Sequence, residues 1–423
     1  MHAAILSIGT ELTRGELTNT NASWLADRLT QLGLEVVEHL TVPDDMERIV
    51  QALGRLCVEG AAVVSTGGLG PTTDDLTAAA AARAAGVARA RHEPSFEALK
   101  ARYQSRGREV TESNATQADL PETATALPNA VGTAPGFELT IGAGRAFFLP
   151  GVPHEMKRMF DDRVHPALAR TVERRSNQVR LRTFGLPESS VGERLAGLEE
   201  ANPGVRIGYR ASFPEIEVKV LATAASEAEA AATANRVADD VRGRLGDAVY
   251  GQGDDTYAEI VGHDLRDQGL TVAVAESCTG GLVGQMLTDV PGSSDYLLFD
   301  AVTYSNAAKT EILGVGSELL RAHGAVSGEC AAAMADGVRR RAGADLAVSI
   351  TGIAGPGGGS EEKPVGTVWM GLAREGHEAT AVLHQLSGER WQIRRRAAFL
   401  ALRTLREAAH AVVADTRSGA VRY

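Results

Sequence analysis

Short apolar runs alternate with amphipathic stretches along the first part of the chain. Apolar runs of strand length lie at residues 5–9, 34–40 and 61–66, and the last is typical of a buried parallel strand. Amphipathic stretches, which predict helices, lie at residues 21–32, 46–57 and 76–85. This alternation predicts an open α/β domain, with ligands beyond the carboxyl ends of the strands. The domain is expected to end near residue 170, after a strand at 147–151 and a helix.

A different pattern follows in the middle of the chain. A strand is expected at 179–185, and a helix at 188–200 has Ser189 and Ser190 as candidate caps. Alternating residues at 206–212 and 216–223 predict a hairpin, and the Ala-rich stretch 227–245 predicts a helix. We interpret this as a small α+β module that ends in a Gly- and Asp-rich linker at 251–255.

The last part of the chain returns to the α/β pattern. Strands are expected at residues 270–275, 346–351 and 366–373, and a long terminal helix at 392–411. The Arg394-Arg395-Arg396 run in that helix is expected on a solvated face, or else at the edge of an anionic site. We therefore predict an α/β protein with three domains, at residues 1–170, 171–252 and 253–423.

Composition excludes several classes of protein. The chain has 423 residues, of which 44% are hydrophobic and 23% charged, as in ordinary globular proteins. A net charge of −11 argues against a general nucleic-acid or membrane-surface binder. We find no apolar run long enough to span a membrane and no secretory signal. Three cysteines do not make a disulfide framework, so the expected location is the cytoplasm.

A glycine-rich turn follows the third apolar run and opens a helix. Gly67, Gly68 and Gly70 would let backbone N–H groups approach a phosphate at the helix start. Asp74 and Asp75 cannot bind phosphate directly, but they can hold a divalent cation that bridges to it. The competing interpretation is a tight turn in which an aspartate only caps the helix.

A second candidate centre lies in the last domain, where Ser277 stands between a buried strand and a helix. A serine needs a base, and no convincing His–Asp pair is nearby. Lys309 follows Tyr304 by five residues, and a desolvated lysine can act as the base with the phenol as proton relay. The competing interpretations are a helix-capping Ser277 and a surface Lys309. Cys278 is a rival nucleophile, although a small buried residue is its commoner role.

A third strand of this domain ends in a further candidate loop. Thr351 could supply a hydroxyl there, and the glycines of residues 352–359 could supply N–H donors to an oxyanion or a phosphate. The same glycines would also suit a flexible hairpin, so this loop alone does not establish a site.

Several motifs at both ends of the chain resemble the CinA family (competence/damage-inducible protein). In the N-terminal half they are Gly9–Leu12, Asn19–Ala22, Gly67–Thr77, Asn114–Ala118, Gly132–Gly136 and Leu149–Glu155. The resemblance implies a fold similar to molybdopterin-binding domains, in which Asp75 acts with a divalent metal (Mg, Mn or Co) that Asp74 also binds. Gly67, Gly68 and Gly70 would then bind substrate. Asp74 replaces a basic residue common in cofactor-biosynthesis members, which favours hydrolysis of the pyrophosphate bond of ADP-ribose.

In the C-terminal half the motifs are Ala275–Gly281, Pro291–Ser294, Tyr304–Lys309, Gly324–Ser327, Ser349–Gly359 and Lys363–Val368. They resemble the CinA domain identified with nicotinamide mononucleotide amidohydrolase activity. The resemblance implies that Ser277 is the nucleophile, Lys309 its base, and Tyr304 and Thr351 supporting groups, without a cofactor. It implies that Arg390 contacts the substrate phosphate. The other substrate-binding residues that it implies are Thr279, Gly280, Gly281, Gly352 and Gly355.

The middle module resembles the KH-like connecting domain of the same family. KH domains clamp RNA through a Gly-X-X-Gly loop. We expect no such loop between residues 179 and 250, so RNA binding is not expected. The resemblance as a whole implies an enzyme of pyridine-nucleotide salvage that acts on small nucleotides and forms a homodimer. Two other functions stay open: processing of a molybdopterin precursor by the N-terminal domain, and a non-catalytic adaptor in DNA uptake or repair.

Overall fold

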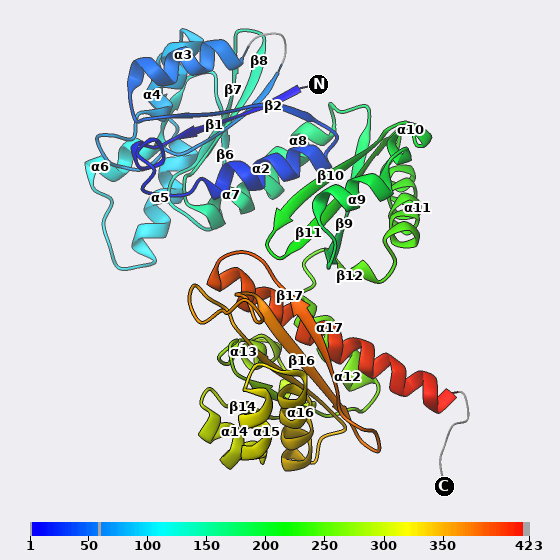
Figure 1. Ribbon diagram of the computed structural model, residues 1–423. Helices are drawn as coiled ribbons and strands as arrows, with labels where there is room; N and C mark the ends of the chain where they lie inside the picture. The colour runs from blue at the N-terminus through cyan, green and yellow to red at the C-terminus, as the bar shows by residue number, and fades with distance from the viewer. Residues whose placement is uncertain (1, 58–60, 418–423) are drawn as a thin grey trace. The chain divides into compact units, whose positions relative to one another are not determined.

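The computed structural model describes residues 2–57 and 61–417. The chain forms two compact units. Among the described residues, the first holds 2–57, 61–178, 203–205 and 221–236, and the second holds 179–202, 206–220 and 237–417. The α/β architecture predicted from the sequence is confirmed, with an α/β domain at each end and a small α+β module between them in the chain (Figure 1).

A six-stranded sheet forms the centre of the N-terminal domain. Its strand order is β2 (Glu35–Val42), β1 (His2–Ile8), β3 (Ala62–Thr66), β8 (Gly144–Leu149), β7 (Gly136–Ile141) and β6 (Thr125–Leu127). The first four are parallel, while β7 and β6 pair antiparallel to their neighbours. A separate two-stranded sheet pairs β4 (Arg89–Arg91) with β5 (Asp119–Pro121).

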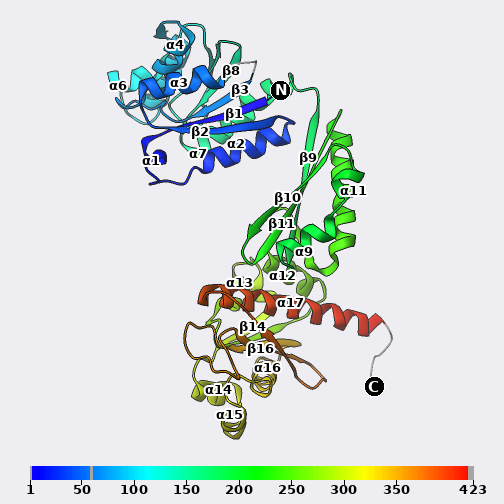
Figure 2. The ribbon, with the colours of Figure 1, turned by 45° about the horizontal axis from the view of Figure 1, so that its top comes forward.

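Helices cover both faces of this six-stranded sheet, so its central strands β1, β3 and β8 are buried on both sides (Figure 2). One face carries α3 (Met46–Leu56) and α4 (Thr77–Ala85), and the other carries α2 (Thr20–Gln31), α7 (Pro153–Met159) and α8 (His165–Ala169). Three further helices complete the domain: α1 (Thr10–Thr13), α5 (Glu93–Gln104) and α6 (Glu112–Ala115). Alternate residues of β1 contribute to the two cores, as its pleat requires.

The middle module contains a four-stranded sheet with the order β10-β11-β9-β12. Its elements are β9 (Arg175–Phe184), α9 (Glu188–Leu195), α10 (Leu198–Ala201), β10 (Val205–Ser212), β11 (Glu215–Ala224), α11 (Glu227–Leu245) and β12 (Val249–Gln252). The single helix expected at 188–200 is wrong, because Gly197 adopts a left-handed φ of 80° and divides it. Pro187, without a side-chain hydrogen bond, precedes α9, so Ser189 and Ser190 are not its caps.

Two further features of this module concern the expectations from the sequence: a Gly-X-X-Gly spacing is present without the loop, and part of the expected linker is a strand. Gly243 and Gly246 do have Gly-X-X-Gly spacing, but Gly243 lies inside α11 and Gly246 directly follows that helix. The spacing therefore ends a helix and does not form a loop between two helices. Gly251 and Gln252, expected in a linker, belong to β12, which pairs with β9.

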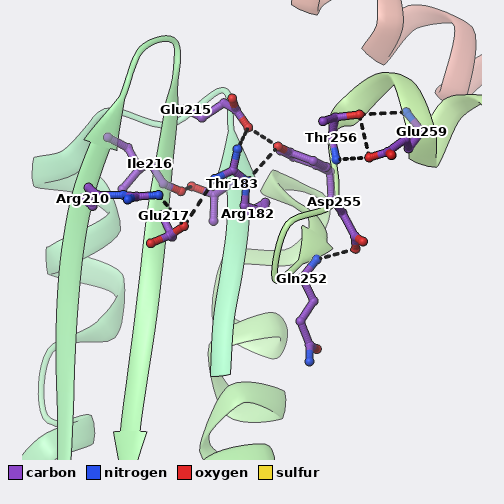
Figure 3. A network of polar contacts seen from close by, with 11 residues as sticks. Arg182, Thr183, Arg210, Glu215, Ile216, Glu217, Gln252, Asp255, Thr256 and Glu259 are labelled. Atoms are coloured by element: carbon purple, nitrogen blue, oxygen red, sulfur yellow. Dashed lines mark hydrogen bonds and ion pairs between the residues drawn. The ribbon is translucent and has the colours of Figure 1, made fainter. Parts of the chain in front are cut away.

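Buried ion pairs connect the strands of the middle module (Figure 3). Glu217 of β11 is 1% exposed, and its Oε2 lies 2.9 Å from Arg210 Nη2 and 3.3 Å from Arg182 Nη1. Arg182 also pairs with Glu215 at 3.3 Å. Because a buried carboxylate is costly unless it is paired, these contacts favour one alignment of β9, β10 and β11.

A five-stranded sheet forms the centre of the C-terminal domain. Its order is β14 (Leu297–Val302), β13 (Val272–Glu276), β15 (Leu346–Gly352), β16 (Thr367–Arg374) and β17 (Thr380–Gln385). The first three are parallel, and β16 and β17 are antiparallel. The core on one face includes α12 (Tyr257–Asp267), α13 (Leu282–Thr288) and α17 (Arg390–Arg417). On the other lie α14 (Asn306–Leu313), α15 (Ser317–His323) and α16 (Gly328–Ala342) (Figure 1).

Within residues 2–57 and 61–417, every helix is too short or too polar to cross a membrane.

Candidate functional site

The candidate site of the C-terminal domain lies where three parallel strands end side by side. Glu276, the last residue of β13, is in register with Val302 of β14 and Ile350 of β15. Ser277 follows β13 directly, and its N–H donates to the Ile350 carbonyl at 3.0 Å. The carboxyl ends of parallel strands are the usual place for ligands in such sheets. Parallel pairing therefore brings residues that are far apart in the sequence to one edge.

Ser277 and Lys309 lie within hydrogen-bond distance of each other. Lys309 Nζ is 3.1 Å from Ser277 Oγ and donates to the Thr303 carbonyl at 2.7 Å. The Lys309 side chain is 1% exposed and Ser277 is 9% exposed. Burial lowers the pKa of Lys309 below its usual value, because the charged ammonium loses its water. The arrangement can therefore hold an amine that accepts a proton from the serine hydroxyl.

Burial shifts the pKa of Cys278, the rival nucleophile, in the direction that makes it less reactive. Burial raises the pKa of its thiol to about 11, so the reactive thiolate is disfavoured at neutral pH. Cys330 is also buried, and its pKa is raised for the same reason. These two residues are placed as small apolar groups of the core.

Tyr304 and Arg390 form the exposed side of this centre. Tyr304 is 62% exposed, and its Oη accepts from Arg390 Nη2 at 3.4 Å. Arg390 Nη1 donates to the Gly355 carbonyl at 2.6 Å, so the guanidinium joins the end of β14 to the loop after β15. Thr351 is buried, and its hydroxyl donates to the Ala325 carbonyl at 2.7 Å. The Thr351 hydroxyl proton is therefore already engaged within the protein.

Glu276 and Arg394 hold the loop that carries Ser277, and sequence reasoning missed both. We call residues 277–281 the nucleophile loop. The fully buried Glu276 carboxylate accepts the N–H groups of Gly281 at 2.9 Å and Gly284 at 2.8 Å. Arg394 donates to the carbonyls of Cys278 at 3.1 Å and Thr279 at 2.6 Å. Arg394 is thus half-buried in a structural contact, and the expected solvated face or anionic edge does not describe it.

The nucleophile loop has fewer free amides than the sequence suggested. The N–H of Gly280 donates to the Ser277 carbonyl at 3.1 Å, and that of Gly281 is taken by Glu276. The N–H groups of Gly280 and Gly281, which the resemblance implies as substrate-binding residues, therefore have acceptors inside the protein. Thr279 is fully buried, and its hydroxyl has no hydrogen-bond partner among the described residues. Gly352 ends β15, and Gly355 has a positive φ of 75° in the following loop.

A second carboxyl, Asp300 of β14, lies close to Glu276. A side chain at Gly284 would begin 1.9 Å from Asp300 Oδ2, so this carboxyl occupies the space that the glycine leaves. Asp300 Oδ1 is buried without a hydrogen-bond partner in the described structure. Burial, followed by repulsion from Glu276, raises the pKa of Asp300 to about 7.

A cleft of about 630 Å³ marks the candidate site of the N-terminal domain. The ends of β1 and β3 form its floor, and the turn of residues 67–75 forms one wall. Gly67 has a φ of 108°, and a Cβ there would lie 2.0 Å from the Ile8 carbonyl oxygen. A Cβ at Gly70 would lie 2.5 Å from Asp75 Oδ2. The glycines at these positions allow the turn to fold tightly against the sheet and against Asp75.

Carboxylates line the same cleft. They are Glu11, Asp44, Asp74, Asp75 and Glu155. Asp75 Oδ2 accepts the N–H of Thr72 at 2.8 Å, which orients its carboxylate. Two amide oxygens beside the cleft, Asn21 Oδ1 and Gln117 Oε1, are buried without a partner among the described residues. The lining of the cleft is therefore rich in oxygen acceptors.

These residues fit a cation held partly by substrate. Within the described residues, no three His, Cys, Asp or Glu side chains are grouped to hold a metal ion by themselves. Mg²⁺ is commonly bound by one or two carboxylates together with water and substrate phosphates. Asp74 and Asp75 provide that number of ligands at the edge of a phosphate-sized turn.

Each part of the chain matches a known protein family. Residues 4–170 match the probable molybdopterin binding domain, residues 178–251 the damage-inducible protein CinA KH domain, and residues 254–409 the CinA C-terminal domain. Among solved structures, the chain is similar to CihA, a competence/damage inducible protein from Agrobacterium tumefaciens. It is 40% identical and covers 38% of this chain and 96% of that one, with a TM-score of 0.33. A CinA protein from Thermoplasma acidophilum is 33% identical, covers 38% and 94%, and has a TM-score of 0.36.

Curated relatives match nearly the whole chain. A CinA-like protein from Geobacter sulfurreducens is 48% identical over 412 residues, which are 96% of this chain and 98% of the relative. A CinA-like protein from Desulfosudis oleivorans is 44% identical over 409 residues, covering 96% and 99%. Because identity at this level extends over all three domains, the chain belongs to the CinA family.

Proposed function

We propose that the C-terminal domain hydrolyses the carboxamide of nicotinamide mononucleotide to nicotinate mononucleotide and ammonia. The observation that carries the proposal is the 3.1 Å separation of Lys309 Nζ from Ser277 Oγ in a buried site. A nucleophile and a base within hydrogen-bond distance are the minimum that acyl transfer from an amide requires. The family resemblance supplies the substrate.

The reaction can be written with these two groups. Neutral Lys309 accepts the Ser277 proton while Oγ attacks the carboxamide carbon. The ammonium of Lys309 then returns the proton to the leaving nitrogen, which departs as ammonia and leaves an acyl-serine ester. Water, deprotonated by the same amine, cleaves the ester and regenerates Ser277. The low pKa of Lys309 suits both directions of transfer, because the amine must be neutral before each attack.

Arg390 is the group that we assign to the substrate phosphate. Its guanidinium is held beside Tyr304 and the Gly355 carbonyl, at the exposed edge of the centre. A planar guanidinium binds phosphate through two parallel hydrogen bonds, which a point charge cannot reproduce. Since Glu276 occupies the amides of Gly281 and Gly284, these N–H groups do not compete with Arg390 for the phosphate.

We further propose that the N-terminal domain hydrolyses the pyrophosphate bond of ADP-ribose. Asp74 and Asp75 would hold a divalent cation, and the turn containing Gly67, Gly68 and Gly70 would approach the phosphates. The cation supplies neutralisation of phosphate charge when it is bound. The turn and the carboxylates line one cleft, which supports this assignment over a cap-only role for the aspartates. Both reactions would place the protein in pyridine-nucleotide salvage.

One assay tests the leading proposal: ammonia release from nicotinamide mononucleotide by the purified full chain. A Ser277→Ala variant that folds normally is the blank. Stoichiometric ammonia and nicotinate mononucleotide, absent in the blank, is the expected result. No ammonia from the wild-type chain would reject the amidase and favour a non-catalytic role. ADP-ribose hydrolysis, measured in the same preparation with and without Mg²⁺, tests the second activity separately.

A further inference from the structure

The nucleophile loop is held from two sides by buried or half-buried charged side chains. Glu276 accepts two N–H groups, one on each carboxylate oxygen, from Gly281 and Gly284. Arg394, from helix α17 more than a hundred residues later in the chain, donates to the carbonyls of Cys278 and Thr279. An anion therefore binds the donors of the loop and a cation binds its acceptors. Hydrogen bonds to ionised groups are the strong ones, so the backbone that directly follows Ser277 is firmly fixed.

Glu276 also connects the loop to the base. Its backbone carbonyl accepts the N–H of Thr303 at 2.8 Å, and the Thr303 carbonyl accepts Lys309 Nζ at 2.7 Å. The residue that fixes the nucleophile loop through its side chain therefore fixes the support of Lys309 through its main chain. The relative position of Ser277 Oγ and Lys309 Nζ depends on this short series of contacts.

Both side chains are directed at the backbone of the protein. Both Glu276 oxygens are engaged by backbone amides, and the side chain has no exposed surface. The half-buried Arg394 uses Nε and Nη2 for the loop carbonyls. Burial against the nucleophile loop separates these two residues from Arg390, which is exposed beside Tyr304.

We propose that Glu276 and Arg394 are positioning residues of the amidase centre, which keep Ser277 Oγ within reach of Lys309 Nζ. The proposal rests on the amidase activity proposed above for Ser277 and Lys309. A reacting group displaced by about 1 Å can cost about a hundredfold in rate, because the attack geometry is lost. Loss of either contact therefore lowers kcat, while the substrate contacts that set KM persist.

The test uses Glu276→Gln and Arg394→Gln in the full chain. Glutamine keeps the size of Glu276, but it presents an NH₂ group to one of the two amides and breaks that contact. Expected is a fall in kcat of about 10- to 100-fold with KM for nicotinamide mononucleotide within about threefold of wild type. Glu276→Asp and Arg394→Lys keep the charges and should recover part of the lost kcat.

Matched controls separate positioning from a general loss of stability. Glu259 caps α12 by accepting the N–H of Thr256 at 2.8 Å and its hydroxyl at 2.9 Å, as Figure 3 shows. Arg339 donates to the Ala344 carbonyl at 3.3 Å at the end of α16. Glu259→Gln and Arg339→Gln remove the same kinds of contact at helix ends, with partners outside the nucleophile loop. They should lower the melting temperature slightly and leave kcat unchanged.

The pH profile provides a readout that a catalytic role would move. If Glu276 only positions the loop, the acid limb of kcat/KM keeps its midpoint in Glu276→Gln, because Lys309 is still the titrating base. A shifted or missing limb would overturn the positioning role and make Glu276 part of the proton transfer. Wild-type kcat in both test variants, or an equal loss in the two controls, would also overturn it.

A substrate-independent measurement keeps this proposal distinct from the proposed function. A fluorophosphonate labels activated serines, and intact mass with Ser277→Ala as blank assigns the label. Slower labelling of both test variants, with controls at the wild-type rate, supports positioning even if nicotinamide mononucleotide is not a substrate. In that case only the proposed function fails. Equal labelling of all variants would reject the positioning role. A wild-type chain that neither labels nor releases ammonia would also reject it, because there would be no activated serine to position.

Discussion

Lys309 Nζ reaches Ser277 Oγ because the strands that precede them, β13 and β14, end in register. Glu276 at the end of β13 pairs with Val302 at the end of β14, so Ser277 and Thr303 follow at the same level of the sheet. Helix α14 then returns Lys309 toward Thr303, whose carbonyl it contacts at 2.7 Å. A parallel pair of strands thus converts a sequence separation of 32 residues into a distance of 3.1 Å.

Removal of the nucleophile or its base should abolish deamidation. Ser277→Ala and Lys309→Met should each lower kcat at least about 1,000-fold, because residues that act as one unit fail together. Methionine is chosen because Lys309 is fully buried and its stem needs an apolar replacement of similar length. Ammonia release measures the loss.

Cys278→Ala is the matched control for this pair. Its buried thiol should contribute packing alone, so turnover should stay near wild type with a small loss of stability. Thermal unfolding of all three variants checks that the fold is retained. The opposite pattern, with activity kept in Ser277→Ala and lost in Cys278→Ala, would show that the nucleophile is the thiol.

Deamidation should increase with pH through the lowered pKa of Lys309. The base must be neutral to accept the serine proton, so activity is lost as pH falls below that pKa. The pKa is lowered in the folded state, so the unfolded chain binds this proton more tightly and the contribution of Lys309 to stability also rises with pH. A profile of kcat/KM with an acid limb centred below the ordinary lysine value is expected. A limb at the ordinary value would show that Lys309 is not desolvated.

Asp300 should make the C-terminal domain less stable as pH rises. Its pKa is raised from 3.8 to about 7, so the folded state binds the proton more tightly than the unfolded state. Its contribution is therefore fully present below pH 3.8 and is lost as pH rises toward about 7. Asp300→Asn keeps the shape without the charge, and should raise stability at pH about 8 more than at pH about 5. Urea unfolding at both values measures this, and an equal shift at both would contradict it.

Chelation should separate the two activities. Hydrolysis of ADP-ribose should stop in excess EDTA and return with Mg²⁺, because the candidate phosphate site has carboxylates in place of basic groups. Asp75→Asn should have the same effect, and it should leave deamidation unchanged. Ammonia release should also survive EDTA, since Ser277 and Lys309 need no Lewis acid. Loss of ammonia release on chelation, restored by metal, would overturn this division of labour.

Arg390→Ala should act on the phosphorylated substrate alone. A charge-assisted contact of about 1.5–3 kcal/mol corresponds to roughly 10- to 100-fold in kcat/KM for nicotinamide mononucleotide. The unphosphorylated riboside never makes that contact, so its slow turnover should not change. Arg390→Lys should recover part of the loss. Equal losses on both substrates would instead assign Arg390 to the support of Gly355 and Tyr304.

Periodicity and strand ends were sufficient to predict much of this architecture. The buried strand at 61–66 corresponds to β3, and the pattern at 21–32 to α2, because each has one clear apolar repeat. The helix at 188–200 was wrong because Gly197 breaks it at a position that apolar spacing does not reveal. The terminal helix, expected at 392–411, extends over Arg390–Arg417, since its polar ends continue beyond the apolar repeat.

The sequence alone could not predict the contacts that hold the nucleophile loop of the candidate centre. Arg394 lies in a run of three arginines that is typical of a solvated helix face, yet it contacts the carbonyl of Thr279, 115 residues earlier. Glu276 is the acidic end of an apolar strand, and only the fold shows that its carboxylate turns back onto Gly281 and Gly284. Motifs identify the groups that react, whereas contacts between distant segments are set by tertiary packing.

The Glu276 carboxylate occupies the N–H groups at the start of α13, and this affects how substrate preference in this domain can change in evolution. When main-chain amides bind an anion, most substitutions leave that binding unchanged, because nearly every residue carries the same backbone N–H group. Here Glu276 occupies the amides of Gly281 and Gly284, so under the proposed function the choice among anionic substrates falls to side chains such as Arg390. A single substitution can replace a side chain without changing the backbone. If the proposed function holds, substrate preference in this domain can therefore change gradually, while the contacts that hold the nucleophile loop stay constant.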